Sequence, residues 1–269
     1  MVKFDAMTPV EPSVHWLADA PNRPRRVALG SFDGLHVGHR RVIAGADTVV
    51  TFSPHPRAVL GNAPPLLHDL DTKIELLGRL GISEVVLVPF DRELAATAAA
   101  DFVDRILVEG LTATHVAVGA NFRFGRRGAG RVAELLADRR FETLAEPLII
   151  REGDVVSSTR IRGMVRQGRI DAATRLLGGP FESRCALERD GECSGRLSWP
   201  SDIVRPGPGA YAGTVRRARG EPVAAEVVVG ADEARLFAAA PLAASGSAVV
   251  ALERRVREAS RELIGSAAA

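Results

Sequence analysis

Two histidines, His36 and His39, stand three positions apart in a glycine-rich stretch that runs from Gly30 to His39. A short valine-containing run precedes the stretch, and a helix is predicted to start near Val37 or Gly38. At this spacing both imidazoles project to the same side of the first helical turn. The N–H groups and positive dipole end of such a turn attract phosphate, and glycines let an anion approach the backbone closely. The stretch therefore favours a phosphate site.

The same histidines allow two other interpretations. A metal site would need a third ligand, for which Asp33 is the local candidate. A structural histidine pair, satisfied within the fold, would need no ligand. In the phosphate interpretation the imidazoles donate hydrogen bonds to phosphate oxygens as charge develops in a transition state. The stretch alone leaves all three interpretations open.

A second segment with phosphate chemistry is Ser157-Ser158-Thr159-Arg160-Ile161-Arg162. Serines are good helix N-caps, and Ile161, Met164 and Val165 give one apolar face, so a helix is predicted to begin here. Cations in the first turn of a helix oppose its dipole, which indicates that an anion accompanies them. The alternative is an ordinary capped helix with solvated arginines.

Two loops supply the remaining candidates. Residues 51–56, "TFSPHP", place His55 between two prolines that fix a rigid turn at the end of a strand. Residues 118–130, "VGANFRFGRRGAG", flank Arg123 with Phe122 and Phe124. Exposed aromatic rings beside a guanidinium suit a flat ring that carries phosphate. The alternative is that the two phenylalanines only anchor the loop.

Short apolar runs alternate with helical patterns over the first two thirds of the chain. Continuous apolar runs suit strands that are buried on both faces of a parallel sheet. The expected fold is therefore a doubly wound α/β sheet, whose ligands gather at the carboxyl ends of the strands. All four candidate segments start near predicted strand ends or helix starts. The predicted strands are residues 25–30, 47–52, 83–90 and 114–119, and the predicted helices are residues 71–81 and 99–110.

The pattern changes at Gly178-Gly179-Pro180, which predicts one domain over residues 1–180 and another over 181–269. The second domain is predicted to be small and mostly β, closed by a helix over residues 252–264. Its predicted β segments are residues 209–217, 222–230 and 246–253.

The composition of the chain indicates which classes of partner to expect. The chain has 269 residues, 46% of them hydrophobic, with a formal net charge of +2, so no polyanion-binding surface is indicated. The first 16 residues lack the apolar run of a signal peptide, and no stretch reaches the roughly 18 apolar residues of a membrane span, so neither segment is expected. Cys185 and Cys193 are predicted to be reduced thiols, which favours the cytoplasm. Small-molecule partners are expected, with neither nucleic acid nor membrane, and nothing specifies an oligomeric state.

Taken together, these segments resemble the bacterial FAD synthetases, which join an N-terminal FMN adenylyltransferase domain to a C-terminal riboflavin kinase domain. "GSFDGLHVGH", "TFSPHP", "DTKIELLGRLG", "VPFDRELA", "VGANFRFGRRGAG", "SSTRIR" and "ATRLLGGPF" occur in the family's order over roughly residues 25–181. The resemblance implies a Rossmann-like nucleotidyltransferase domain followed by a β-barrel-like kinase-type domain. It further implies that the phosphate of FMN attacks the α-phosphorus of ATP, with Mg²⁺ on the triphosphate and no covalent enzyme intermediate.

The resemblance also implies roles for individual residues, with no resident metal site among them. The catalytic set comprises His36, His39, Ser158, Thr159 and Arg162, the last three at the leaving pyrophosphate. Phosphate binding falls to Gly30, Ser31, Phe32, Asp33, Gly34, Gly38, Ser157 and Arg160. The flavin and adenine region is lined by Ser53, Pro54, His55, Asn121, Phe122, Arg123 and Phe124.

Several positions depart from the family's pattern. The helix after His39 is short, Asn121 stands where the family often has Asp, and Gly179 replaces a usual arginine. At the kinase motif "GFPTAN" this chain reads "LSWPSDI", with Ser201 and Asp202 after the proline, and Glu226 is the one tempting catalytic carboxylate. We therefore expect a kinase-like barrel without kinase activity. Two further hypotheses are a related transferase with another donor or acceptor, and a non-catalytic flavin- or nucleotide-binding paralogue.

Overall fold

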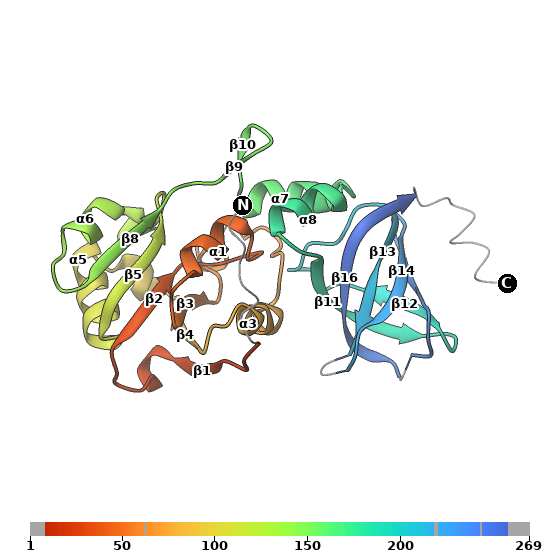
Figure 1. Cartoon of the computed structure of the whole chain (residues 1–269), viewed down its shortest axis with the longest axis horizontal. Helices are drawn as coiled ribbons and strands as arrows, with labels where there is room; N and C mark the ends of the chain where they lie inside the picture. The colour runs from red at the N-terminus through yellow and green to blue at the C-terminus, as the bar shows by residue number, and fades with distance from the viewer. Residues whose placement is uncertain (1–8, 62, 218–219, 243, 258–269) are drawn as a thin grey trace. The chain divides into compact units, whose positions relative to one another are not determined.

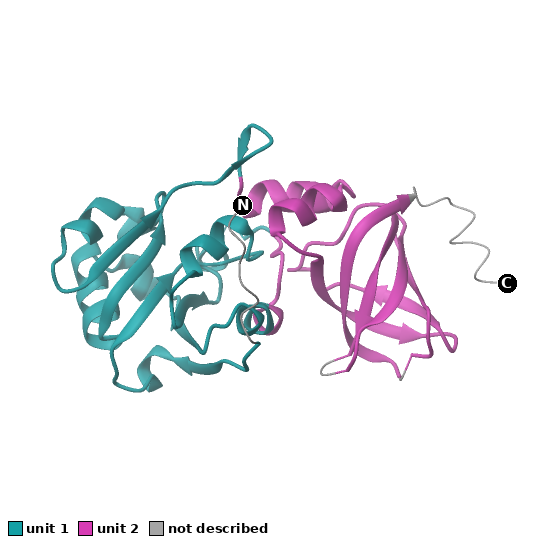
Figure 2. Cartoon of the chain, viewed as in Figure 1, with its two compact units in different colours: residues 1–64, 73–155 teal, residues 65–72, 156–269 magenta. Residues whose placement is uncertain are grey.

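The structure, a computed structural model, describes residues 9–61, 63–217, 220–242 and 244–257. The contacts between residues divide the chain into two compact units, which Figure 2 shows in two colours. The first unit comprises residues 1–64 and 73–155, and the second comprises residues 65–72 and 156–269. Each unit has its own sheet and its own core, and each is described by itself.

The first unit is built on a six-stranded sheet in which every neighbouring pair of strands runs parallel. The strand order is β1-β4-β3-β2-β5-β8 (Figure 1). The predicted strands are confirmed as β2 to β5, whereas β1 and β8, the two edge strands, were not predicted. The strands are β1 (Ser13–Trp16), β2 (Arg25–Leu29), β3 (Thr48–Ser53), β4 (Glu84–Pro89), β5 (Ala113–Gly119) and β8 (Glu142–Glu146).

Burial explains why the inner strands read as apolar runs. Val27, Val50, Val86 and Val116, one from each inner strand, are at most 1% exposed. They join a core cluster with side chains of the helical segment over residues 99–110. That segment is confirmed as helical, first α5 (Ala99–Phe102) and then a π-helix, η2 (Val103–Gly110).

The strand order reverses between β2 and β5. The chain adds β3 and β4 on one side of β2 and then crosses to place β5 on the other side. In doubly wound sheets a crevice for ligands forms at such a reversal, outside the carboxyl ends of the strands. The segments that follow β2 and β5 are therefore the ones that the fold places at a binding position.

Short helices connect these strands. The predicted helix over residues 71–81 is confirmed as α3, and the helix after His39 is short, as expected, with seven residues in α1. The helices and small strands are η1 (Leu17–Asp19), α1 (Val37–Ile43), α2 (Pro56–Val59), α3 (Leu70–Arg79), α4 (Arg92–Ala96), β6 (Arg123–Phe124), η3 (Arg126–Gly128), β7 (Gly130–Arg131), α6 (Val132–Ala137), β9 (Ile150–Arg151) and β10 (Asp154–Val155). No helix in the described part of the chain is both long and apolar enough to cross a membrane.

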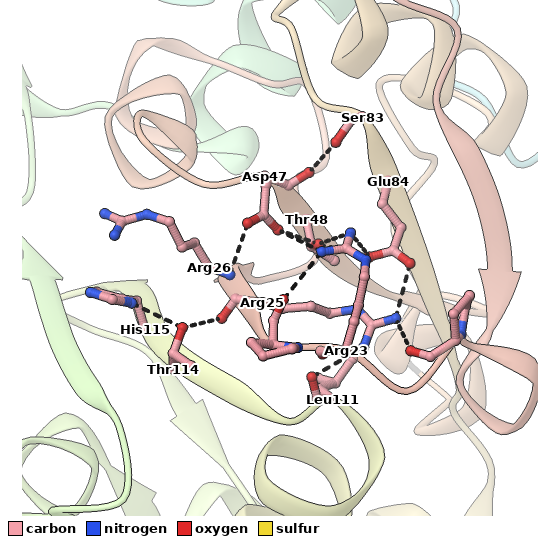
Figure 3. Close-up of polar contacts among 12 residues, drawn as sticks. Arg23, Arg25, Arg26, Asp47, Thr48, Ser83, Glu84, Leu111, Thr114 and His115 are labelled. Carbon is pink, nitrogen blue, oxygen red and sulfur yellow. Dashed lines mark hydrogen bonds and ion pairs between the residues drawn. The ribbon is translucent and has the colours of Figure 1, made fainter.

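A buried ionic network closes the amino ends of the central strands (Figure 3). Arg25, which is 0% exposed, donates from Nε and Nη2 to the two carboxylate oxygens of Glu84 at 2.8 and 3.0 Å. The Arg23 guanidinium lies 2.8 Å from Glu84 Oε2, and the Thr48 hydroxyl lies at the same distance. Burial alone raises the pKa of Glu84, but hydrogen bonds from Arg25 and Thr48 and the nearby positive charges outweigh it. The net pKa lies below the usual value of 4.5.

The second unit is a closed antiparallel barrel with strand order β11-β12-β15-β14-β13-β16. Closure pairs β16 with both β11 and β13, which leaves no free strand edge. Helix α8 packs on β16 and β11. The elements are α7 (Ser158–Arg166), α8 (Ile170–Leu177), β11 (Phe181–Arg189), β12 (Ser194–Ser198), β13 (Gly209–Arg216), β14 (Val223–Val229), β15 (Ala234–Ala238) and β16 (Gly246–Arg257).

The predicted helix over residues 252–264 is wrong for residues 252–257, which continue strand β16. Leu252 is buried and pairs with Phe181 on one side and Gly213 on the other. The helical pattern is overridden because the backbones of β11 and β13 need a partner to close the barrel. Residues 258–264 lie outside the described part of the chain.

The β segments predicted for the second domain are confirmed as β13, β14 and β16, whereas β11, β12 and β15 were not predicted. The barrel starts at Phe181, while residues 156–180 group with it by their contacts. Both cysteines are unbridged, and burial raises the pKa of the Cys185 thiol to about 12.

The buried network predicts a large stability effect at one carboxylate. Glu84→Ala leaves the Arg25 guanidinium buried without its counter-ion, so we expect the free energy of unfolding to fall by about 3–5 kcal/mol. Urea denaturation measures it. The matched control is Glu93→Ala, which removes an exposed carboxylate 3.7 Å from Arg105 and should cost no more than about 0.5 kcal/mol. Equal losses for the two variants would contradict this assignment.

Candidate functional site

The turn between β2 and α1 has an unusual backbone for its residue types. Phe32 and Leu35 adopt positive φ angles of 49° and 42°, and Gly34 adopts 87°. Residues other than glycine rarely adopt this region, at a cost of about 1–3 kcal/mol each. The side chains of Phe32 and Leu35 are buried, at 2% and 1% exposure, which offsets that cost. The turn is therefore held by packing in a shape that its sequence alone does not favour.

His36 is the N-cap of α1. Its Nδ1 accepts a hydrogen bond from the backbone N–H of His39 at 3.2 Å. Because Nδ1 is the acceptor, the proton of the neutral imidazole resides on Nε2, which is left as a donor. A Cβ at position 38 would lie 3.2 Å from the His36 ring, so a larger residue there would require that ring to shift by a few tenths of an ångström. The predicted helix start is thus confirmed, and the cap also fixes the tautomer of His36.

The two imidazoles lie together, as the spacing predicted. Their ring centroids are 3.6 Å apart with an interplanar angle of 13°, and the ring of Phe32 meets His39 edge-on at 5.4 Å. His36 is 6% exposed, and burial lowers its pKa from 6.5 to about 4 although the charge of Asp33 opposes the shift. His36 is therefore a neutral hydrogen-bond donor near pH 7.

A buried charge pair lies behind this turn. Lys73 of α3 and Asp33 are only 5% and 3% exposed, and the Lys73 ammonium donates to the carbonyl oxygen of Ser31 at 2.9 Å. Burial lowers the pKa of Lys73, and the charge of Asp33 acts in the opposite direction. Lys73 was not among the predicted site residues. The sequence did carry a signal for the burial of Lys73. This lysine stands four positions before Leu77, on the face of α3 that is otherwise apolar.

The "SPHP" turn follows β3 at the same edge of the sheet. His55 caps α2, with Nδ1 accepting from the backbone N–H of Arg57 at 3.2 Å. Ser53 and His55 are half-buried, and Pro54 is exposed. This turn therefore presents side chains to the same side of the sheet as the histidine pair, because parallel strands end at a common edge.

The loop after β5 matches its prediction only in part. Asn121 and Arg123 are exposed, and Phe122 is half-buried. The expectation of two exposed aromatics is wrong for Phe124, which is 5% exposed and packs against Phe102 and Phe122. Phe124 is buried in the core because β6 pairs with β7, which places the Phe124 ring against Gly130. Phe124 thus anchors the loop, and Phe122 is the phenylalanine of this loop that could contact the ring of a ligand.

The segment Ser157–Arg162 belongs to the second unit. The hydroxyl of Ser157 accepts from the backbone N–H of Arg160 at 3.3 Å, which confirms the predicted N-cap of α7. Ser158 is half-buried, Thr159 is exposed, and Arg162, the fifth residue of α7, is 8% exposed.

Within the described residues, no group of three or more His, Cys, Asp or Glu side chains is arranged to hold a metal ion. The turn and the histidine-capped helix follow β2 directly, and the Phe122 loop follows β5, so they flank the reversal of strand order. Sheet and turn together define a doubly wound α/β domain with a candidate ligand site at the reversal of strand order.

Comparison with known proteins identifies the family. A family model described as FAD synthetase matches residues 19–160, more than half of the chain. The chain therefore belongs to the FAD synthetase family.

Curated relatives carry the name bifunctional riboflavin kinase/FMN adenylyltransferase. The protein of Listeria monocytogenes is 31% identical over 194 residues, covering 66% of this chain and 62% of the relative. That of Escherichia coli K12 is 30% identical over 209 residues, covering 71% and 66%. The matched region thus spans slightly less than two thirds of either relative. A solved structure described as a macrolide-efflux protein from Streptococcus pneumoniae superposes with a TM-score of 0.82 at 21% identity, over 96% of both chains, which shows the fold alone.

The low pKa of His36 predicts how stability changes with pH. Its folded pKa of about 4 lies below the unfolded value of 6.5, so protonation favours the unfolded chain as the pH falls. Between pH 7 and pH 4 we expect the free energy of unfolding to fall by about 3 kcal/mol more in the wild type than in His36→Asn. Asparagine retains an N-cap, so the two proteins should be similar at pH 7. Urea denaturation over this range measures the difference, and parallel pH profiles would contradict the assignment.

Proposed function

We propose that this chain is an FMN adenylyltransferase, which transfers AMP from MgATP to FMN. A phosphate oxygen of FMN attacks the α-phosphorus of ATP, the bond from that phosphorus to the bridging oxygen breaks, and pyrophosphate leaves as FAD forms. The observation that carries the proposal is the stacked His36–His39 pair, held at the strand-order reversal of a domain that matches the FAD synthetase family.

The histidine pair supplies donors for the charge that develops on the phosphates. A neutral His36 offers Nε2–H without the desolvation cost of a buried imidazolium. Donors that are already in place strengthen their interaction as negative charge builds on the transferred and leaving oxygens. In the proposal, Gly30, Ser31, Phe32, Asp33, Gly34 and Gly38 surround the phosphates through the backbone of the turn.

The remaining residues bind the two ends of the substrates. Ser158, Thr159 and Arg162 would hold the leaving pyrophosphate, with Ser157 and Arg160 supporting that helix start. Mg²⁺ would enter on the triphosphate as part of the substrate. The flavin and adenine region would be lined by Ser53, Pro54, His55, Asn121, Phe122 and Arg123, with Phe124 behind them. The cytoplasmic location stays a prediction from the sequence.

The central test is pyrophosphate release with FMN and each nucleoside triphosphate in turn. We expect release and FAD formation with ATP, and a fall in kcat of about 10²–10³-fold in His36→Asn and in His39→Asn, because each removes a transition-state donor. The matched control is His115→Asn, which changes a half-buried histidine that lies beside Glu142 elsewhere on the sheet and should retain activity.

Other outcomes of this assay favour the other hypotheses. Release with another triphosphate or another phosphorylated acceptor would indicate a related transferase, which the seven-residue α1 gives some reason to consider. Tight binding of ATP or FMN without any release would indicate a non-catalytic paralogue. Full activity of both histidine variants would refute the proposed roles.

We further propose that the barrel has lost riboflavin kinase activity. The segment after β12 carries Ser201 and Asp202 where the family's threonine and asparagine are expected. Both side chains are exposed, and the Asp202 carbonyl accepts from the backbone N–H of Leu66 at 2.6 Å. Glu226 lies half-buried on β14 opposite Phe237, and its role as a catalytic base has no support from a neighbouring Thr–Asn pair.

The kinase proposal predicts no FMN from riboflavin, ATP and Mg²⁺. Chromatography separates riboflavin, FMN and FAD, so one reaction mixture reports both activities. FAD formation from added FMN in the same preparation is the control for an active enzyme. Robust conversion of riboflavin to FMN would refute the loss of kinase activity and leave the adenylyl transfer proposal unaffected.

A further inference from the structure

Lys73 is a buried cation that the proposed reaction does not yet use. Lysines are almost never fully buried unless they are paired. Here the ammonium makes a 2.9 Å hydrogen bond to the Ser31 carbonyl, and the buried carboxylate of Asp33 is the charge that acts on it. Both partners belong to the turn that leads to His36. The lysine itself comes from α3, which is remote from that turn in sequence.

The Ser31 carbonyl oxygen accepts two hydrogen bonds. Besides Lys73, the hydroxyl of Thr51 on β3 donates to the same oxygen at 3.2 Å, and Thr51 is 0% exposed. In a trans peptide the C=O and the following N–H point in opposite directions. Drawing the Ser31 oxygen inward toward Lys73 and Thr51 therefore turns the N–H of Phe32 outward. Phe32 is also the first residue of the turn with a positive φ angle, 49°.

We infer that Lys73 is a positioning residue for the proposed adenylyl transfer, which holds the Ser31–Phe32 peptide so that the turn presents its N–H groups and the histidine pair to the phosphates. The inference rests on the proposed function. Lys73 acts through the turn and does not itself contact substrate. Thr51 acts on the same carbonyl, and the charge of Asp33 opposes the effect of burial on the pKa of Lys73.

The test uses variants that change one contact each. Lys73→Met keeps the length of the side chain but removes the ammonium, and Thr51→Val keeps the shape but removes the hydroxyl. The control is Arg79→Met, which removes a positive charge from an exposed position on the same helix. Steady-state kinetics are measured at least 20 °C below the unfolding midpoint of each variant, so loss of folded protein does not contribute.

We expect kcat to fall about 10²-fold in Lys73→Met, because displacement of a positioned group by about 1 Å costs that much. The KM for FMN should stay within about twofold, since the acceptor loops do not contact Lys73 in this account. Thr51→Val should lower kcat in the same direction by a smaller factor. The double variant should lose less than the product of the single effects, because both residues act on one oxygen.

A second readout does not depend on turnover. Amide resonances of residues 30–39 should shift in Lys73→Met and in Thr51→Val, and should stay in place in Arg79→Met. Unmoved resonances in Lys73→Met, wild-type kcat in that variant, or an equal loss of kcat in Arg79→Met would each overturn the inference. If the wild type makes no FAD, the proposed function fails, and the amide shifts still decide whether Lys73 holds the turn.

Discussion

Every strand in the sheet of the first unit runs in the same direction, so the chain leaves β2, β3 and β5 at one common edge. The turn with the histidine pair, the "SPHP" turn and the Phe122 loop are far apart in sequence, and each begins where one of these strands ends. The reversal of strand order between β2 and β5 sends their connections in opposite directions, and doubly wound sheets bind ligands at such a reversal. None of the three segments specifies this proximity by itself. It follows from the parallel pairing, which is why the chemistry of the site depends on the buried valine runs of the inner strands.

Buried ionisable side chains have different partners at the two ends of this sheet. At the amino ends, Arg25 is satisfied by the Glu84 carboxylate and by the carbonyls of Pro21, Arg23 and Leu111, so the protein itself completes the arrangement. At the carboxyl ends, the Lys73 ammonium has Asp33 as its acting counter-charge, and the uncharged His36 lies beside the same turn. A fully neutralised network suits an end that only maintains the fold. In the proposed reaction, the uncharged His36 would donate to a phosphate oxygen without a counter-ion of its own.

The sequence predicted the elements whose signals are local. Strands β2 to β5 are continuous apolar runs, and the starts of α1 and α7 depend on caps within a few residues. Edge strand β1 was missed because "SVHW" pairs on one side only and stays largely exposed, so it lacks the apolar run of an inner strand. The predicted helix at residues 252–257 failed for the opposite reason, since closure of the barrel outweighs helix propensity there. The expected exposure of Phe124 was wrong because its packing partner Phe102 is distant in sequence. Lys73 was assigned no role because its hydrogen-bond partner Ser31 is also distant, although its place on the apolar face of α3 indicated burial.

His36 shows how one local contact can determine several properties of a residue. Capping α1 through Nδ1 satisfies a backbone N–H that would otherwise lack a partner, and it assigns the ring proton to Nε2. The same burial that orders the cap keeps the ring uncharged near neutral pH. A serine or aspartate would cap the helix equally well. The imidazole differs because it places its acceptor and its donor at separate positions of one rigid ring, so the helix start and a phosphate oxygen can be engaged at the same time.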